Sequence, residues 1–229
     1  MTEQTKRVQR PDGRKARTRK ALLDAGSKLF SEQGVERTTV DEIAEAAGVS
    51  VGSLYVHFGS KDSLLLQLID QALEINEQYM QAPEATSALA RVLIAGEWYL
   101  RFAMEQTVAF RFVAMRVLEP DQSSANDEVN ERIAERVQRI VLRVTSDLGQ
   151  AMEDGEIEKV DLSHAMVFLW GAWNGVAGLV LRQDSLAVTQ EVAEAALLQG
   201  REILIKGLGG DPAQYRDLPG LPPTPPSAR

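Results

Sequence analysis

The segment TTVDEIAEAAGVSVGSLYVHFGSKDSLL, residues 38–65, decides the fold of the N-terminal part of this chain. Thr39 and Glu42 within it have the spacing of a capping box. In that motif the hydroxyl accepts a hydrogen bond from the amide three residues on, and the carboxylate accepts one from the amide of the first residue. A short helix is therefore expected to begin after Thr39 and to end at Gly48, because glycine readily adopts the left-handed conformation that closes helices.

A second short helix is expected over residues 51–58, between a capping Ser50 and a terminating Gly59. Two helices joined by a short turn that contains glycine form a helix-turn-helix. Their close crossing needs a small residue and apolar partners, which Ala44 and Leu54 supply. A helix of about eight residues is about 12 Å long, so it fits a DNA major groove of about 12 Å. The alternative is an ordinary helical hairpin inside a bundle.

The start of the second helix carries small side chains, which would let its backbone approach the edges of DNA bases. Hydroxyl groups at these positions can bond either type of base. The candidates for base contact are Ser50, Val51, Gly52 and Ser53. The helix holds no arginine or asparagine, so it lacks a strong bidentate base reader. We expect Arg37, just before the first helix, and the basic N-terminal arm to add contacts.

Polar residues further along are candidates for contact with DNA phosphates. Tyr55 and His57 have polar tips that can donate to phosphate oxygens, and such contacts fix register without reading sequence. Lys61 falls in the first turn of the next helix, where backbone amides favour anions. The alternative for Tyr55 and His57 is a role in packing. Leu54 and Phe58 are expected to face inward.

Residues 14–75 resemble the N-terminal domain of the TetR family of transcriptional regulators, through LLDAGSKLFSEQGVERTTVDEIAEAAGVSVGSLYVHFGSKDSLL. The resemblance implies that Thr39, Tyr55, His57 and Lys61 clamp the DNA backbone, with Thr38 as a further candidate for DNA contact. It also implies a homodimer that binds a pseudo-palindromic operator in double-stranded DNA, and repression that a small ligand relieves. The rest of the chain matches the family only in size and helical character.

Helical periodicity dominates the whole chain, and alternating β-branched runs are absent, so we expect an all-α protein of about nine helices. We expect the N-terminal part to be a three-helix unit that contains the helix-turn-helix. The expected domains are a basic flexible arm (1–13), the helix-turn-helix domain (14–61), a connecting helix (62–82), a ligand-binding and dimerisation domain (83–209) and a Pro-rich disordered tail (210–229). The expected helices are 14–32, 40–47, 51–58, 61–81, 84–105, 107–118, 126–154, 163–182 and 188–208.

Composition and charge narrow the function further. The chain has no cysteine and only two histidines, so we expect no metal site and no cofactor. Its net charge is −8, yet residues 1–20 hold eight lysines and arginines against two acidic residues. A basic arm on an acidic body suggests that one end meets a polyanion, and the alternative is a solvated tail.

No segment of the sequence is expected to enter a membrane. The first twenty residues are polar and contain no apolar signal-peptide core, so we expect a cytoplasmic protein. The most apolar stretch, residues 165–181, is shorter than the span of about 20 residues that a bilayer needs, and it contains Asn174. A buried helix fits this stretch better.

Two helical faces near the C-terminus are candidates for a homodimer interface. Gly171, Gly175 and Gly178 keep one surface of the expected 163–182 helix thin, so that another helix can approach it closely. The last helix has a similar face of Ala193, Ala196, Leu197, Gly200, Leu204 and Leu208. Two such helices from each subunit would form a four-helix interface. The alternative is that the same faces pack within one subunit.

Aromatic residues and methionines gather between residues 84 and 182, and such side chains form the adaptable walls of small-molecule sites. We expect an unidentified, largely apolar effector with one polar group, although the alternative is plain core packing. Asn174 would need a hydrogen-bond partner if buried. The candidate ligand residues are Trp98, Phe102, Phe110, Met115, Met166, Trp170, Trp173 and Asn174.

Three functions compete for this sequence. The first is a dimeric, ligand-responsive repressor of transcription, and the second is a helical protein that binds or sequesters small molecules without operator binding. The third is an enzyme, which we reject because the sequence has no thiol, no acid–base pair at useful spacing and no glycine-rich phosphate loop after a strand. No catalytic residue is predicted.

Overall fold

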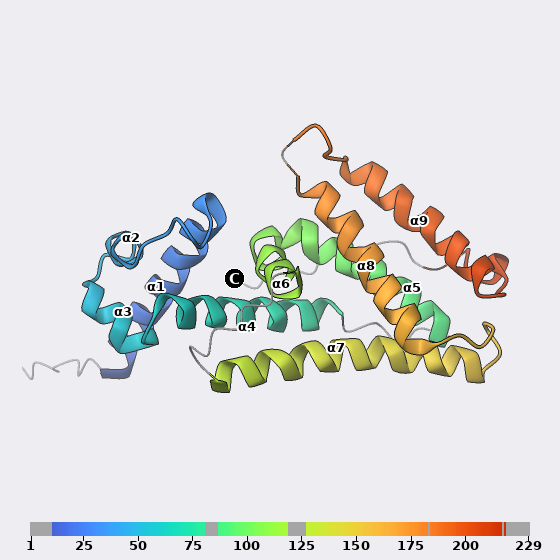
Figure 1. Ribbon diagram of the computed structural model, residues 1–229, viewed down its shortest axis with the longest axis horizontal. Helices are drawn as coiled ribbons and strands as arrows, with labels where there is room; N and C mark the ends of the chain where they lie inside the picture. The colour runs from blue at the N-terminus through green and yellow to red at the C-terminus, as the bar shows by residue number, and fades with distance from the viewer. Residues whose placement is uncertain (1–10, 81–86, 119–126, 183, 217, 219–229) are drawn as a thin grey trace, which may run out of the picture. The chain divides into compact units, whose positions relative to one another are not determined.

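The computed structural model describes residues 11–80, 87–118, 127–182, 184–216 and 218. These residues form nine α-helices and one 3-10 helix without any strand, which confirms the expected all-α fold (Figure 1). They divide into two units, which we call the head and the body. The head contains residues 11–70 and 127–130, and the body contains the remaining described residues.

Three helices and the first half of a fourth build the head: α1 (Pro11–Gln33), α2 (Val40–Ala46), α3 (Val51–Phe58) and α4 (Lys61–Tyr79). Their inward side chains are almost fully buried, among them Leu22, Phe30, Ile43, Leu54 and Leu64. The helix α1 begins at Pro11 rather than at residue 14. Proline suits this position because the first turn of a helix does not use its N–H group. The rest of the predicted arm, residues 1–10, lies outside the described residues.

Glycine ends the early helices as the sequence predicts. Gly34, Gly48 and Gly59 all have positive φ angles, of 84°, 66° and 80°. Other residues pay a steric penalty in this region of backbone space. These three breaks therefore fix where α1, α2 and α3 stop, and they hold the helix-turn-helix to its short turn.

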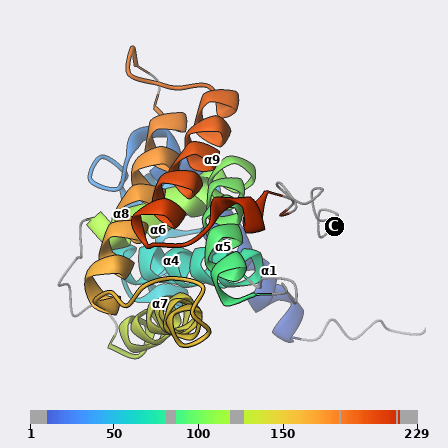
Figure 2. The same cartoon turned by 90° about the vertical axis from the view of Figure 1, so that its right-hand side faces the viewer.

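The second half of α4 and five further helices build the body: α5 (Ala88–Glu105), α6 (Thr107–Leu118), α7 (Asp127–Glu153, from Glu131 onward), α8 (Leu162–Val180) and α9 (Gln190–Gly207). The helix α5 is the most buried of them. The helices α8 and α9 lie side by side in both views and pack on α5 (Figures 1 and 2). Trp173 of α8 lies directly against Gly96 of α5, where a larger residue would collide with the indole ring.

The boundaries of α7, α8 and α9 lie within two residues of the prediction, and two other parts of the body differ from it more clearly. The helix α5 begins at Ala88 rather than at residue 84, because the Ser87 hydroxyl accepts a hydrogen bond from the amide of Ala90 and caps it there. The tail was predicted to lack helix after Gly209, which is wrong for its first residues. Pro212–Tyr215 form a 3-10 helix, and the Tyr215 ring is buried. Residues 217 and 219–229 of the predicted disordered tail lie outside the described residues.

Candidate nucleic-acid interface and internal cavity

Local hydrogen bonds shape the turn between α2 and α3. The Thr39 hydroxyl accepts from the Glu42 amide at 3.2 Å, and the Glu42 carboxylate accepts from the Thr39 amide at 2.8 Å, so the predicted capping box is confirmed. These bonds to Thr39 lower the pKa of Glu42 below its usual value. Beyond the turn, the Val49 amide donates to the Ala44 carbonyl at 3.0 Å. The bend between the two helices is thus set by the backbone itself.

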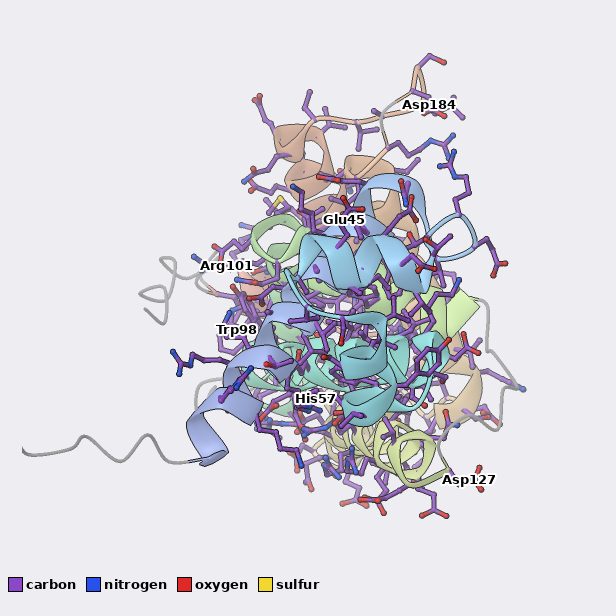
Figure 3. The ribbon with its side chains drawn as sticks, turned by 90° about the vertical axis from the view of Figure 1, so that its left-hand side faces the viewer. Glu45, His57, Trp98, Arg101, Asp127 and Asp184 are labelled. Atoms are coloured by element: carbon purple, nitrogen blue, oxygen red, sulfur yellow. The ribbon has the colours of Figure 1, made fainter. Side chains whose placement is uncertain are left out.

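The helix α3 presents one face to solvent, and Figure 3 looks onto the head with His57 on α3 and Glu45 on α2 turned toward the viewer. Leu54 and Phe58 are buried, as predicted. The opposite face consists of Gly52, Tyr55 and Val56, with Tyr55 53 % exposed. The side chains of Val51, Ser53 and His57 are half-buried.

Val56 is a residue that the sequence reasoning missed. It is 79 % exposed, the largest exposed fraction among the large apolar side chains described. The signal was available, because the inward residues Leu54 and Phe58 are four apart, which places Val56 on the opposite side of a helix. An exposed apolar side chain on a helix that reads DNA can contact the methyl group of thymine.

One predicted helix cap, at Ser50, and one predicted DNA contact, at Thr38, are wrong. Ser50 occupies the N-cap position of α3, but its side chain makes no capping hydrogen bond and instead lies 3.0 Å from the Ser53 hydroxyl. Its hydroxyl therefore remains exposed at the start of α3. Thr38 is only 1 % exposed, and its hydroxyl donates to the Gly34 carbonyl at 2.7 Å. A buried side chain that ties down a turn cannot contact DNA.

Lys61 has a structural task inside the head. Its Nζ donates to the carbonyl oxygens of Val35 and Thr38 at 2.9 and 3.0 Å. These carbonyls belong to the segment between α1 and α2, so the ammonium ties that segment to the start of α4. An ammonium group has three N–H donors, so one remains for a phosphate. Contact between Lys61 and DNA stays a prediction.

Two arginines of the head differ in role. Arg37 is exposed, and its Nε donates to the Gln33 carbonyl at 2.7 Å, which places a cation at the C-terminal end of α1. Arg19 was counted in the basic N-terminal region. Its guanidinium lies 5.1 Å above the centre of the Phe58 ring and donates to Gln67 at 2.7 Å. Arg19 therefore helps to hold α1 against α3 and α4.

The body contains a small apolar cavity of about 30 Å³ between α4, α5, α6, α7 and α8. Of the predicted ligand residues, Met166, Trp170 and Trp173 line it. Its other walls are Leu73, Asn76, Met80, Tyr99, Val113, Val137, Ile140, Val141 and Val144. The aromatic and methionine pattern therefore identified one wall of a cavity, and α4 and α7 supply walls that it did not indicate.

The remaining predicted ligand residues do not line this cavity. Phe102 and Phe110 are 0 % and 2 % exposed and stack behind Tyr99, with the Tyr99 and Phe110 rings 5.6 Å apart. They are core residues because their rings pack against one another. Trp98 is half-buried and lies away from the cavity walls. The side chain of Met115 lies outside the described part of the structure.

Asn174 is paired within the subunit. Its side-chain oxygen accepts from the Tyr99 hydroxyl at 3.0 Å, and its side-chain nitrogen donates to the Trp170 carbonyl at 2.8 Å. Asn174 is half-buried rather than buried, and the protein itself provides partners for its amide group. Burial raises the pKa of Tyr99, so its hydroxyl keeps its proton and remains a donor.

An open hollow of about 440 Å³ lies outside the cavity, between α4, α5 and α7. It shares Met80, Ile140 and Val144 with the cavity. Charged side chains line it and pair with one another, since Glu77 accepts from Arg139 at 2.9 Å and Asp147 accepts from Arg91 at 2.7 Å. The hydrogen bond from Arg139 lowers the pKa of Glu77, so the carboxylate stays charged.

The outer faces of α8 and α9 expose apolar side chains. Val167 and Phe168 are both 69 % exposed on α8, and Ile203 is 64 % exposed on α9. A Cβ atom added at Gly171, Gly175, Gly178 or Gly200 would meet nothing within 4 Å, so these glycines are not packed within the subunit. Ala193, predicted to lie on the α9 face, is instead buried, because the inward face of α9 runs through Ala193 and Ile205.

The described part of the chain has neither a cluster of metal-binding side chains nor a membrane-spanning helix. No group of three or more histidine, cysteine, aspartate or glutamate side chains there could hold a metal ion. Among the described helices, none is long and apolar enough to cross a membrane. The apolar helix α8 packs on α5 and α9 instead.

Comparison with known families identifies the head. Residues 22–68 match the family described as bacterial regulatory proteins, tetR family. The probable HTH-type transcriptional regulator ArpR of Pseudomonas putida is 27 % identical over 181 residues, which are 76 % of this chain and 86 % of that protein. The probable acrEF/envCD operon repressor of Escherichia coli (strain K12) is 25 % identical, over 70 % of this chain and 74 % of that protein. Three other regulators match mainly over the head, and the match covers 26–32 % of their length.

Solved structures extend the likeness to both units. The TetR family transcriptional regulator PfmR from Thermus thermophilus superposes with a TM-score of 0.62 at 25 % identity. The superposition covers 82 % of this chain and 97 % of that one. The fold of head and body together is thus that of a known class of regulators.

Proposed function

This chain belongs to the TetR family of transcriptional regulators, and from that membership we propose that it is a homodimeric repressor which a small, largely apolar effector releases from its operator. The observation that carries the proposal is the exposed face of α3. The side chains on this face do not pack against the rest of the head, and the preceding helix α2 is fixed by its capping box. We propose that the head binds DNA, and that the body binds the effector and forms the dimer interface.

In the proposed complex, α3 enters the major groove and its N-terminal residues approach the base edges. The small side chains of Val51, Gly52 and Ser53, together with the exposed hydroxyl of Ser50, permit this approach. Val56 adds an apolar contact to a thymine methyl group. Direct reading of bases is modest, because no bidentate side chain lies on α3.

Contacts to phosphates surround this helix in the proposed complex. Tyr55 and His57 donate from α3, and Arg37 offers its exposed guanidinium beside α2. Lys61 uses its remaining donor, and Thr39 lies at the positive end of α2. Such contacts set the position of the head on the duplex, and they make affinity fall steeply with salt.

The homodimer is proposed to form through α8 and α9. Their exposed apolar side chains and open glycines make a surface that a second copy can cover, and a two-fold axis would bring the same surface from each subunit together. A helix-turn-helix dimer reads two half-sites, which predicts a pseudo-palindromic operator. The open glycines favour this reading over packing inside one subunit.

The effector is proposed to bind in the cavity of the body. Its volume of about 30 Å³ is far below the roughly 300–1,000 Å³ of ordinary ligand sites. Binding must therefore displace its walls, and Leu73, Asn76 and Met80 on α4 or just beyond its end are three of them. Because α4 is one unbroken helix from Lys61 to Tyr79, a shift of its second half is transmitted to the head.

The proposed release follows from linkage. The effector must bind one arrangement of the heads better than the other, or it shifts nothing. If the effector lowers the affinity for the operator by some factor, a bound operator must lower the affinity for the effector by the same factor. The alternative function is a protein that binds small molecules without operator binding, and it predicts no sequence preference on DNA.

The test is a titration of a fluorescently labelled duplex from the region upstream of the coding sequence of this protein. A scrambled duplex is the control, and both are measured at about 50 mM and about 200 mM salt. We expect the upstream duplex to bind at least a thousandfold more tightly than the scrambled one at the higher salt, roughly as specific sites do. Equal binding of the two duplexes would contradict operator recognition and favour the alternative.

A further inference from the structure

Asn76 stands out among the walls of the cavity. It lies on α4, is only 3 % exposed, and belongs to the residues that line the cavity. Its side-chain oxygen is buried and has no hydrogen-bond partner. A buried acceptor without a partner loses the bonds that water gave it, at a cost comparable to a lost hydrogen bond. Native proteins keep few such groups, so each one calls for a reason.

The surroundings of Asn76 offer no partner. Most cavity walls are aliphatic or aromatic, with no charged side chain among them. The Tyr99 hydroxyl, which could have donated, instead donates to Asn174 at 3.0 Å. Among the described residues that line the cavity, Asn76 alone carries a fully buried side-chain oxygen or nitrogen without a partner.

A trapped water molecule is a poor explanation for this arrangement. The cavity has room for one, since a water needs roughly 10–15 Å³ by the same kind of measure. A buried water is well held, however, only where two to four polar groups surround it. Here the Asn76 oxygen is the one unpaired buried group that the described walls provide.

We propose that Asn76 is the polar contact for the effector, and that the effector is an uncharged apolar molecule carrying one hydrogen-bond donor, such as a hydroxyl group. This inference rests on the proposed function, because it takes the cavity as the effector site. The apolar walls receive the body of the molecule, and the Asn76 oxygen accepts its donor. A neutral molecule is favoured over an anion, because no cationic side chain among the walls would offset the cost of burying a negative charge.

The position of Asn76 also explains how binding is sensed. Asn76 lies one turn beyond Leu73 on the same face of α4, and both line the cavity. A ligand that bonds to Asn76 therefore holds the helix that continues into the head. A ligand without the donor fills the same space but leaves the Asn76 oxygen unpaired. Its affinity is therefore lower than that of a ligand with the donor.

The experiment uses the full chain and three matched probe pairs, in which one member has a hydroxyl group and the other does not. The pairs are 2-naphthol with 2-fluoronaphthalene, phenol with fluorobenzene, and cyclohexanol with methylcyclohexane. Affinities are measured by calorimetry for the wild type, for Asn76→Leu and for Leu89→Val as a control, because Leu89 is buried on α5 and does not line the cavity. We expect the wild type to bind the hydroxyl member of at least one pair about tenfold more tightly. Asn76→Leu should lose this preference, and Leu89→Val should keep it.

Thermal unfolding of the unliganded protein provides the second readout. Asn76→Leu should raise the Tm, because it removes an unpaired buried oxygen, keeps the same branched arrangement of four heavy atoms, and can extend into the adjoining cavity. A lower Tm would mean that Asn76 has structural partners, and it would overturn the proposal. Equal wild-type affinity for both members of every pair, or a preference that survives in Asn76→Leu, would overturn it too.

The outcomes separate this inference from the proposed function. Equal binding of both members, with operator binding by the wild type intact, removes the role of Asn76 alone. If no member of any pair binds, the cavity is not the effector site, and both the role of Asn76 and the release mechanism fail. The duplex titration without any probe tests operator recognition separately, so a failure of the proposed function is seen there and not in the probe measurements.

Discussion

At the scale of single residues, Val56 is the sharpest test of how α3 reads DNA. Val56→Ala should leave the free energy of unfolding within about 0.5 kcal/mol of the wild type, because the side chain is 79 % exposed. It should weaken operator binding about tenfold, since two carbon groups no longer leave water on contact with a thymine methyl group. Both quantities are measured by denaturant titration and by anisotropy of the labelled duplex.

The thymine methyl group that Val56 is expected to contact can also be removed from the DNA. Replacing each operator thymine by deoxyuridine removes only the methyl group, and one such change should weaken the wild type while leaving Val56→Ala unaffected. Leu186→Ala serves as the control, because Leu186 is 63 % exposed in the loop between α8 and α9. If every deoxyuridine duplex weakens both proteins alike, Val56 does not contact a methyl group.

Lys61 is the second residue-scale prediction, and it concerns stability. Lys61→Met should lower the free energy of unfolding of the head by about 1–3 kcal/mol, because the carbonyls of Val35 and Thr38 lose their charged donor. Lys28→Met is the control, since Lys28 is exposed on α1. Urea titration of both variants distinguishes them. Unchanged stability of Lys61→Met would leave phosphate contact as its only role.

At the scale of helices and loops, short-range patterns were predictable and long-range contacts were not. The capping box of Thr39 and the glycine ends of α1 to α3 follow from residues within four positions of one another, so the sequence displays them directly. Lys61 reaches a carbonyl 26 residues away, and Tyr215 reaches a carboxylate 59 residues away. No spacing rule reveals such pairs, because tertiary packing creates them.

The candidate sites divide in the same way. The outward face of α3 could be read from helical periodicity, including Val56, although the prediction overlooked it. Thr38 was misassigned because burial depends on how the segment before α2 folds against its neighbours. Asn174 and Asn76 are both asparagines inside helices, and only their neighbours decide which one has its side-chain oxygen paired. The polar contact of the cavity therefore required the structure.

The junction of α5 with the C-terminal 3-10 helix gives a prediction about pH. One Glu156 carboxylate oxygen accepts from the amides of Ala88 and Leu89 at 3.0 and 3.4 Å, and the other accepts from the Tyr215 hydroxyl at 2.6 Å. Burial alone would raise the pKa of Glu156. The hydrogen bonds that it accepts, from Ser87, Tyr215 and these amides, outweigh burial and lower the pKa below 4.5.

The sign of the pH effect follows from this lowered pKa. The contribution of Glu156 to stability is fully present above the unfolded pKa of about 4.5, and it is lost as pH falls through the lower folded value. Tyr215→Phe keeps the buried ring and removes the donor, so it should cost about 1 kcal/mol at pH 7. The difference from the wild type should shrink below about pH 4. Denaturant titrations at both pH values test this, and a difference that is constant with pH would contradict it.

At the scale of the whole molecule, the net charge of the chain affects how it can bind DNA. The net charge of the chain is −8, although its first 20 residues are strongly basic. A net negative charge opposes nonspecific attachment to DNA, so binding depends on contacts that the head places correctly. A single head provides few such contacts, and two heads held at a fixed spacing provide twice as many. The operator recognition that we propose for this protein therefore depends on the proposed dimer.

Phe168 offers the direct test of that dependence. It is 69 % exposed on α8, so Phe168→Glu should leave the subunit folded while placing two carboxylates near each other in a symmetric interface. Sedimentation at micromolar concentration should show a dimer for the wild type and a monomer for the variant. Operator affinity should fall by at least a hundredfold, because one head alone engages half of the site. Leu142→Glu, on α7 and 56 % exposed, is the matched control and should remain dimeric. A monomeric wild type, or a Phe168→Glu variant that stays dimeric and binds the operator normally, would show that α8 and α9 are not the interface.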